Sequence, residues 1–141
     1  MRVVALVPTY DNPRTVRGVV DQIRRRDLDA IVVDDGSGPE GRRACEALAA
    51  DGLATVLHRP RNGGKGAACK DGFRLAAELG YTHAFQIDAD GQHDVEAIES
   101  FLDAARAEPE AVVIAYPQYD ASAPLSRRFA RGLTNFWVAV E

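Results

Sequence analysis

Residues 2–23, RVVALVPTYDNPRTVRGVVDQI, predict a buried strand followed by an amphipathic helix. The run 2–7 is rich in valine and apolar after Arg2, as a strand buried on both faces of a sheet is, and it stops at Pro8. Asn12 suits the capping position of a helix, and Pro13 suits its first residue. Four apolar residues then recur with the spacing of one helical face: Val16, Val19, Val20 and Ile23.

The same alternation of strand and helix continues along the chain. It is typical of an α/β fold with a mostly parallel sheet and helices on both faces. Ligands of such sheets bind beyond the carboxyl ends of the strands, so the polar loops that follow the strands form the candidate site. Further strands are expected over residues 30–33, 54–57, 82–87 and 111–115. Helices, counted with their capping residues, are expected over 12–26, 37–52, 65–79 and 94–108.

The C-terminal part of the sequence breaks the alternation, so we divide the chain into a first domain over 1–115 and a further region over 116–141. Residues 126–140 have helical spacing, with arginines at the start and aromatic residues along one face. Such a helix suits a lipid phosphate or a membrane surface, and equally a protein surface outside this chain or a second copy in a homodimer. The helical pattern still runs at Glu141 without a capping signal, so we expect an N-terminal fragment of a longer protein.

Composition argues against several classes of protein. With 46% hydrophobic and 27% charged residues among 141, the chain is expected to fold. Its net charge of −4 argues against a nucleic-acid partner. No apolar run approaches the roughly 20 residues of a membrane-spanning helix, and no signal peptide is expected after Met1. Cys45 and Cys69 lack metal or redox spacing and are expected in the core of a cytoplasmic protein. If the helix over 126–140 binds a membrane, that protein would lie at the cytoplasmic face of the membrane.

The sequence DADGQ, residues 88–92, follows an apolar strand. In an extended chain, residues i and i+2 point the same way, about 7 Å apart, so Asp88 and Asp90 would repel each other unless a cation lay between them. Oxygen-seeking Mn²⁺ or Mg²⁺ is the natural partner, and Gln92 offers a further oxygen. We therefore predict a metal site here. The alternative is a polar turn in which Asp94 caps the next helix.

The sequence DDGS, residues 34–37, also follows a strand. Asp34 and Asp35 cannot both face the site in extended geometry, and we expect Asp35 to accept a hydrogen bond from a base N–H or a ribose hydroxyl. Ser37 is expected to cap the next helix. The glycines of GSGPEG, residues 36–41, formally match a dinucleotide fingerprint, but that fingerprint belongs after the first strand, and the two aspartates would repel a pyrophosphate.

A third polar loop contains NGGKG, residues 62–66, at the start of a predicted helix. Glycines allow the backbone to approach a ligand, and a helix N-terminus favours anions, so Lys65 is a candidate phosphate contact. The pattern is not a P-loop, because it lacks that motif's first glycine and the Ser or Thr after the lysine. The alternative is a flexible helix start whose glycines serve close packing.

Four segments together resemble the family 2 glycosyltransferases of the GT-A fold, and within them the dolichyl-phosphate mannose synthase group. They are VPTYDNPRTV (7–16), IVVDDGS (31–37), NGGKGAA (62–68) and QIDADGQHD (86–94), in the family's order and spacing, and the tail resembles a bacterial branch. The resemblance implies a Rossmann-like GT-A nucleotide-diphospho-sugar transferase fold. It also implies transfer of a sugar from a UDP- or GDP-linked donor to an acceptor such as a polyprenyl phosphate, with inversion of the anomeric centre.

The resemblance also assigns roles to individual residues. A divalent metal, Mn²⁺ or Mg²⁺, would assist departure of the nucleoside diphosphate. The catalytic base is expected beyond Glu141, and the fragment is expected to be weakly active or inactive alone. Metal ligands are expected at Asp90, Asp88 and Gln92. Nucleotide contacts are expected at Pro8, Thr9, Tyr10, Asp35, Lys65 and Asp88.

Two other functions stay open. A sugar nucleotidyltransferase would use a similar half-sheet, but it needs a basic, glycine-rich loop after the first strand, where this chain has Pro8-Thr9-Tyr10-Asp11. A non-catalytic nucleotide-binding or interaction module would keep the loops without the activity, because a fold does not by itself imply a function.

Overall fold

The computed structural model describes residues 1–91 and 97–114. The chain divides into two compact units, Met1–Ala111 and Val112–Glu141. Of the second unit, only residues 112–114 lie in the described part. Three predictions concern residues outside the described ranges: the helix over 126–140, the capping role of Asp94 and the metal-ligand role of Gln92.

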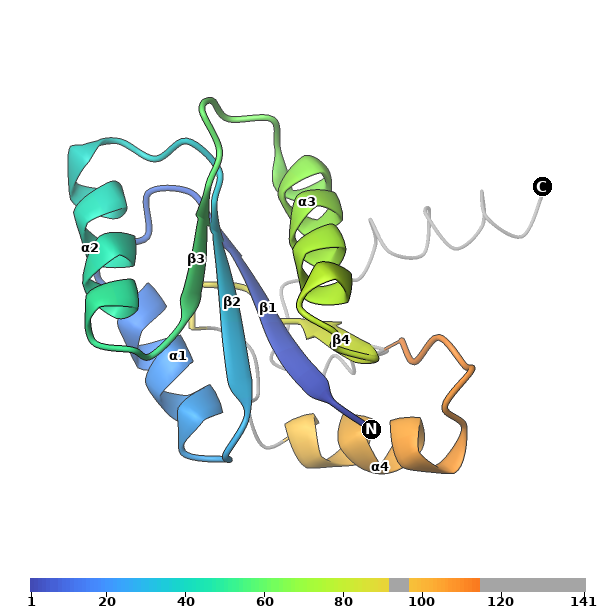
Figure 1. Cartoon of the computed structure of the whole chain (residues 1–141). Helices are drawn as coiled ribbons and strands as arrows, with labels where there is room; N and C mark the ends of the chain where they lie inside the picture. The colour runs from blue at the N-terminus through green and yellow to red at the C-terminus, as the bar shows by residue number, and fades with distance from the viewer. Residues whose placement is uncertain (92–96, 115–141) are drawn as a thin grey trace, which may run out of the picture. The chain divides into compact units, whose positions relative to one another are not determined.

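The first unit is built from strands that alternate with helices (Figure 1). The strands are β1 (Val3–Thr9), β2 (Asp29–Asp34), β3 (Thr55–His58) and β4 (His83–Gln86). The helices are α1 (Val16–Arg24), α2 (Pro39–Ala50), α3 (Lys65–Glu78) and α4 (Ala97–Ala107). The strands form one sheet in the order β3-β2-β1-β4, and every pair is parallel. The predicted α/β fold with a parallel sheet is confirmed.

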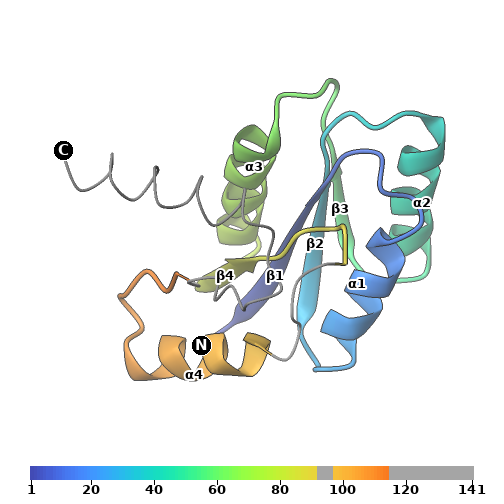
Figure 2. The ribbon, with the colours of Figure 1, turned by 180° about the vertical axis from the view of Figure 1, so that it is seen from behind.

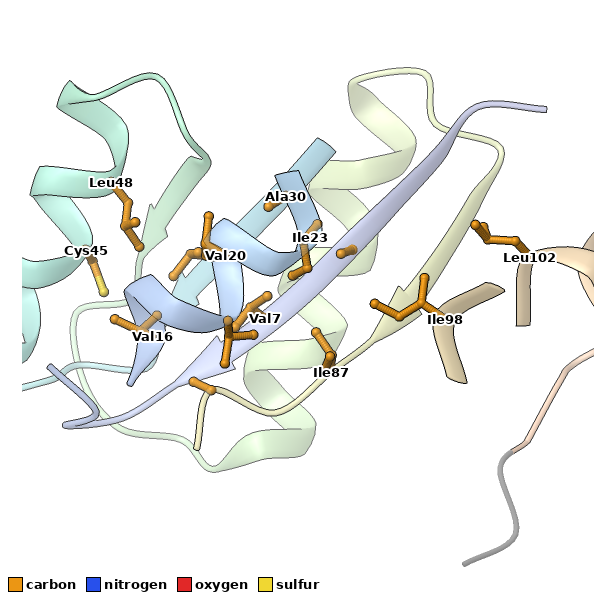
Figure 3. Packing of buried hydrophobic residues seen from close by; sticks show 14 residues of the cluster. Val7, Val16, Val20, Ile23, Ala30, Cys45, Leu48, Ile87, Ile98 and Leu102 are labelled. Atoms are coloured by element: carbon orange, nitrogen blue, oxygen red, sulfur yellow. The ribbon is translucent and has the colours of Figure 1, made fainter. Parts of the chain in front are cut away.

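Alternate residues of the central strands face opposite sides of the sheet, as the two-residue period of a strand requires. Helices α1 and α2 lie on one side of the sheet, and α3 lies on the other (Figure 2). Ala5 and Val7 of β1 face the side covered by α1, α2 and α4, whose apolar residues complete the larger cluster (Figure 3). Val4 and Leu6 face the other side, which α3 covers through small residues such as Ala68. The central strands β1 and β2 are therefore buried on both faces, which explains their nearly continuous apolar sequences.

Some predicted boundaries are wrong. Helix α1 begins at Val16, because residues 13–15 form a turn in which the carbonyl of Asn12 accepts hydrogen bonds from the amides of Thr15 and Val16. Asn12 therefore does not cap this helix with its side chain, which donates instead to the carbonyl of Tyr10 at 3.0 Å.

The predicted fifth strand over 111–115 is also wrong for residues 111–114. The amide of Ala111 donates to the carbonyl of Glu108, closing a turn after α4. Val112 and Ile114 are 87% and 82% exposed. An apolar, β-branched run becomes a strand only where a neighbouring strand pairs with it, and none in the described part of the chain does so here.

Candidate active site

A cleft of about 400 Å³ opens at the carboxyl ends of β1, β2 and β4. The carboxyl ends of parallel strands meet at one edge of the sheet, so the loops that follow them share this space. Twelve residues line it: Pro8, Thr9, Tyr10, Asn12, Asp35, Asn62, Gly64, Lys65, Ala68, Asp88, Ala89 and Asp90.

The cleft brings together the residues predicted from four separate stretches of sequence. All six predicted nucleotide contacts line it, and so does Asp90, the first of the predicted metal ligands. Gln92 lies outside the described residues. The structure thus places these side chains in one cleft, while their individual roles remain predictions.

The first loop is locked to the start of α2 by two reciprocal hydrogen bonds. The amide of Asp11 donates to Ser37 Oγ at 2.9 Å, and Asp11 Oδ1 accepts from the amide of Gly38 at 2.8 Å. Gly38, not Ser37, occupies the capping position of α2, so the predicted cap is wrong. The carboxylate that satisfies this helix start comes from another loop. A dinucleotide-binding loop would need the Gly38 amide to bind a pyrophosphate. Here that amide donates to Asp11 instead, which argues against the dinucleotide fingerprint.

The paired aspartates after β2 turn in different directions. Asp34 is 1% exposed; its Oδ1 accepts from the Ser37 amide at 2.9 Å, and its Oδ2 lies 2.7 Å from His58 Nδ1. Burial alone would raise the pKa of Asp34, but hydrogen bonds from Ser37 and His58 outweigh it and hold the pKa below its ordinary value. Asp35 lines the cleft, as expected. Asp34 thus does not line the cleft; it holds the loop after β2 and the end of β3 together through Ser37 and His58.

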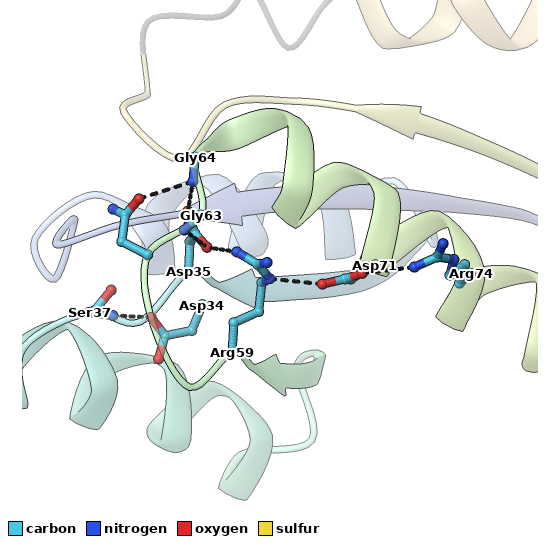
Figure 4. Close-up of polar contacts among 9 residues, drawn as sticks. Asp34, Asp35, Ser37, Arg59, Gly63, Gly64, Asp71 and Arg74 are labelled. Carbon is cyan, nitrogen blue, oxygen red and sulfur yellow. Dashed lines mark hydrogen bonds and ion pairs between the residues drawn. The ribbon is translucent and has the colours of Figure 1, made fainter.

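Asp35 also fixes the glycine loop that precedes α3 (Figure 4). Its carboxylate accepts from the amide of Gly63 at 3.0 Å and from that of Gly64 at 2.8 Å, and it forms an ion pair with Arg59. The loop passes so close to Gly36 that a Cβ at that position would lie 2.6 Å from the Arg61 carbonyl carbon. Gly36 also has a φ of +76°, so glycine is required there on two counts.

Two of the predicted metal ligands, Asp88 and Asp90, line the same cleft. Lys65 Nζ, at the first residue of α3, lies 2.5 Å from Asp88 Oδ1. The carbonyl of Ala89 accepts from Thr15 Oγ1 at 2.6 Å, which ties this loop to the start of α1. Residues 1–91 and 97–114 hold no group of three or more His, Cys, Asp or Glu arranged to bind a metal ion. Asp88 and Asp90 nevertheless supply two carboxylates in one cleft, and two carboxylates with substrate phosphates form a normal ligand set for Mg²⁺.

Sequence reasoning missed several residues of this site. Asn12 and Asn62 line the cleft although neither was predicted to do so. Asn62 stood inside the quoted glycine motif, and its Oδ1 accepts from the Gly64 amide at 3.0 Å. Sequence reasoning assigned Arg59 no role of its own. Its ion pair with Asp35 spans 24 residues, and no local pattern indicates it.

Two named proteins align with about three quarters of this chain. An undecaprenyl-phosphate mannosyltransferase of Micrococcus luteus is 36% identical over 110 residues, which cover 75% of this chain and 45% of that protein. A polyprenol monophosphomannose synthase of Mycolicibacterium smegmatis is 34% identical over 111 residues, covering 75% of this chain and 42% of that protein. The chain therefore spans less than half the length of either relative. None of the helices in the described ranges is long and apolar enough to cross a membrane.

Solved structures agree with the fold. A mannosyltransferase of Pyrobaculum calidifontis, PcManGT, solved with GDP-Man and Mn²⁺, is 26% identical with a TM-score of 0.54, covering 63% of this chain and 27% of that one. The S. aureus protein TarS 1-349 has a TM-score of 0.62 at 16% identity, over 88% of this chain and 41% of that one, and shows the fold alone. The model of the family described as glycosyl transferase family 2 matches residues 4–136. With the GT-A-like sheet and its cleft, that match establishes that the chain belongs to glycosyl transferase family 2.

Proposed function

We propose that this chain is the donor-binding part of a glycosyltransferase that moves a sugar from a nucleoside diphosphate to a polyprenyl-phosphate acceptor. The names of two relatives support the acceptor class and favour mannose as the sugar. GDP is the first candidate for the donor nucleotide, because the related PcManGT was solved with GDP-Man. UDP is the second, since a more distant relative of Methanococcus voltae, 26% identical, is named for UDP-N-acetylglucosamine.

The observation that carries the proposal is the convergence of the predicted contacts in one cleft. Pro8, Thr9 and Tyr10 would line the nucleoside end, where Asp35 supplies a hydrogen-bond acceptor. Lys65 would approach the diphosphate from the N-terminus of α3, a position that favours anions. Residues 1–115 would thus form the donor domain, and residues 116–141 would begin the acceptor side.

The residues present fit a divalent cation. Asp88 and Asp90 offer hard carboxylate oxygens in the same cleft as Lys65, and Mn²⁺ or Mg²⁺ prefers such oxygens together with phosphate. When bound, the metal would neutralise the charge that develops on the departing nucleoside diphosphate. Lys65, which forms an ion pair with Asp88, adds a positive charge to the same cleft. An acceptor approaching from the other side of the sugar would invert the anomeric centre.

The test is nucleotide binding by the 141-residue chain. Isothermal titration with GDP, UDP, CDP and ADP, each with and without Mn²⁺, is expected to show one preferred nucleotide that binds more tightly with the metal. Asp90→Asn removes one carboxylate charge and is expected to abolish the gain from Mn²⁺. Asp103→Asn is the matched control, because Asp103 is an exposed acid on α4 that does not line the cleft and that pairs with Arg106 of the same helix.

The possible results separate the parts of the proposal. If no nucleotide binds at millimolar concentration, the donor-binding function is wrong. If a nucleotide binds but Asp90→Asn keeps the full gain from Mn²⁺, the metal assignment alone is wrong. Turnover of a sugar 1-phosphate with a nucleoside triphosphate would instead support the nucleotidyltransferase.

A further inference from the structure

We propose that Arg59 is a positioning residue for the donor site, which it shapes without lining the cleft. The inference rests on the proposed function, since it concerns how the same cleft is held ready for a nucleotide. Arg59 follows β3, and it joins the aspartate after β2 to helix α3, which begins at Lys65. These are elements whose relative placement sets the width of the cleft.

The guanidinium of Arg59 lies between two carboxylates from different elements (Figure 4). Its Nη1 pairs with Asp35 Oδ1, and its Nε donates to Asp71 Oδ2, on α3, at 2.8 Å. The Arg59 amide donates to the carbonyl of Asp34 at 2.8 Å, so the backbone of this residue is fixed as well. A planar fork with several donors can bind two carboxylates at once, whereas a lysine ammonium is a point charge.

Asp35, which Arg59 holds in place, in turn fixes the position of the glycine loop, residues 62–64. Its side chain is 4% exposed and takes donors from Arg59, Gly63 and Gly64. A carboxylate has about four acceptor positions, and the Gly63 amide contacts both oxygens, at 3.0 and 3.2 Å, so the protein's own donors occupy most of these positions. Without Arg59, a nearly buried carboxylate would lose its counter-charge and would no longer hold the loop in one geometry.

Gly63 supplies an independent way to disturb the same contact. A Cβ at this position would lie 2.6 Å from Arg59 Nη1 and 2.8 Å from Nη2. The guanidinium therefore occupies the space that any side chain at position 63 would need. Gly63→Ala would displace the guanidinium while leaving every charge of the network in place.

The experiment compares variants of the 141-residue chain by nucleotide titration with Mn²⁺ and by NMR of the Gly63 and Gly64 amides without nucleotide. Arg59→Gln is expected to raise the Kd of the preferred nucleotide at least about tenfold, because a charged hydrogen bond to a buried group is lost. Gly63→Ala is expected to act in the same direction. Arg59→Lys keeps the charge near Asp35 and is expected to recover part of the affinity. Both Arg59 variants should shift the two glycine amide signals.

Two matched controls separate this role from a general effect on folding. Arg74→Gln removes an arginine that pairs with the same Asp71 but is 62% exposed and makes no contact with Asp35 in the structure. Gly18→Ala adds a methyl group to helix α1, away from the cleft, where nothing lies within 4 Å. Both controls are expected to keep the Kd within about twofold of the parent, well short of the tenfold effect that corresponds to a full charged hydrogen bond.

Each outcome decides one claim. If the parent binds nucleotide and Arg59→Gln binds equally well, the positioning role is wrong and the proposed function stands. If the glycine amides do not move in Arg59→Gln, Arg59 does not hold the loop, and the inference is overturned whatever the affinity. If the parent binds no nucleotide, the proposed function fails and the positioning role fails with it. A variant that does not fold leaves Gly63→Ala and Arg59→Lys to decide.

Discussion

Gly72 gives the sharpest prediction about how α3 is held on the sheet. It lies in the middle of the helix, against side chains of the two central strands. A Cβ at this position would lie 2.2 Å from Leu6 Cδ1 and 2.9 Å from Val33 Cγ2, and both partners are fully buried. Carbon atoms pack best at about 3.5–4.0 Å, so Gly72→Ala requires Leu6 or the whole helix to move by about an ångström or more.

The magnitude follows from two opposing effects. Alanine favours a helix interior over glycine by about 1 kcal/mol. Overpacking a well-packed core costs about 1–3 kcal/mol, and the upper end applies here because the neighbouring side chains are enclosed. We therefore expect Gly72→Ala to lower the free energy of unfolding by about 1–2 kcal/mol. For a chain of this size the midpoint of thermal unfolding falls by several degrees.

The assay is urea unfolding of the parent and of two alanine variants, followed by far-UV circular dichroism. Gly66→Ala is the control in the same helix, where an added methyl group meets nothing within 4 Å. It is expected to raise the free energy of unfolding by up to about 1 kcal/mol. A Gly72→Ala variant as stable as Gly66→Ala would refute the reasoning, because the close contact with Leu6 would then carry no cost.

Two further predictions concern buried titratable groups. Hydrogen bonds lower the pKa of Asp34 in the folded chain. At a pH above the ordinary carboxyl pKa these bonds stabilise the fold, and the stabilisation is lost as the pH falls through the lowered pKa of Asp34. The stability difference between the parent and Asp34→Asn should therefore be full at pH 7 and shrink below about pH 4 in urea unfolding; a constant difference would contradict the linkage. Burial raises the pKa of the Cys45 thiol to about 12, and burial also raises that of Cys69, which is more exposed. Iodoacetamide at pH 8 should therefore label Cys69 before Cys45 in the native protein, by peptide mass spectrometry, and equal rates would show that Cys45 is accessible.

Much of the fold and the site followed from local patterns. β1 and β2 were predictable because a strand buried on both faces must be apolar along its length. The expectation that only one of Asp34 and Asp35 faces the cleft followed from the alternation of side chains along a strand. The cleft itself followed from topology, because parallel strands bring their carboxyl ends to one edge.

What sequence reasoning could not provide depends on contacts between distant segments. The apolar run 111–115 looks like a strand, but pairing decides that, and sequence alone does not show whether a partner exists. Ser37 looks like a helix cap, yet its hydroxyl accepts from Asp11 across 26 residues. The ion pair between Arg59 and Asp35 depends in the same way on how the loops after neighbouring strands meet.

The position of β1 at the centre of the sheet has a consequence for the order in which the chain is made. Val3 of β1 pairs with His83 of β4, eighty residues later. At a synthesis rate of about 5–20 residues per second, β1 waits roughly 4–16 s on the ribosome before its second neighbour exists. During that interval one hydrogen-bonding edge of an apolar strand is uncovered, and such edges recruit other chains. The nascent protein should accordingly be a client of ribosome-associated chaperones until residue 86 has emerged.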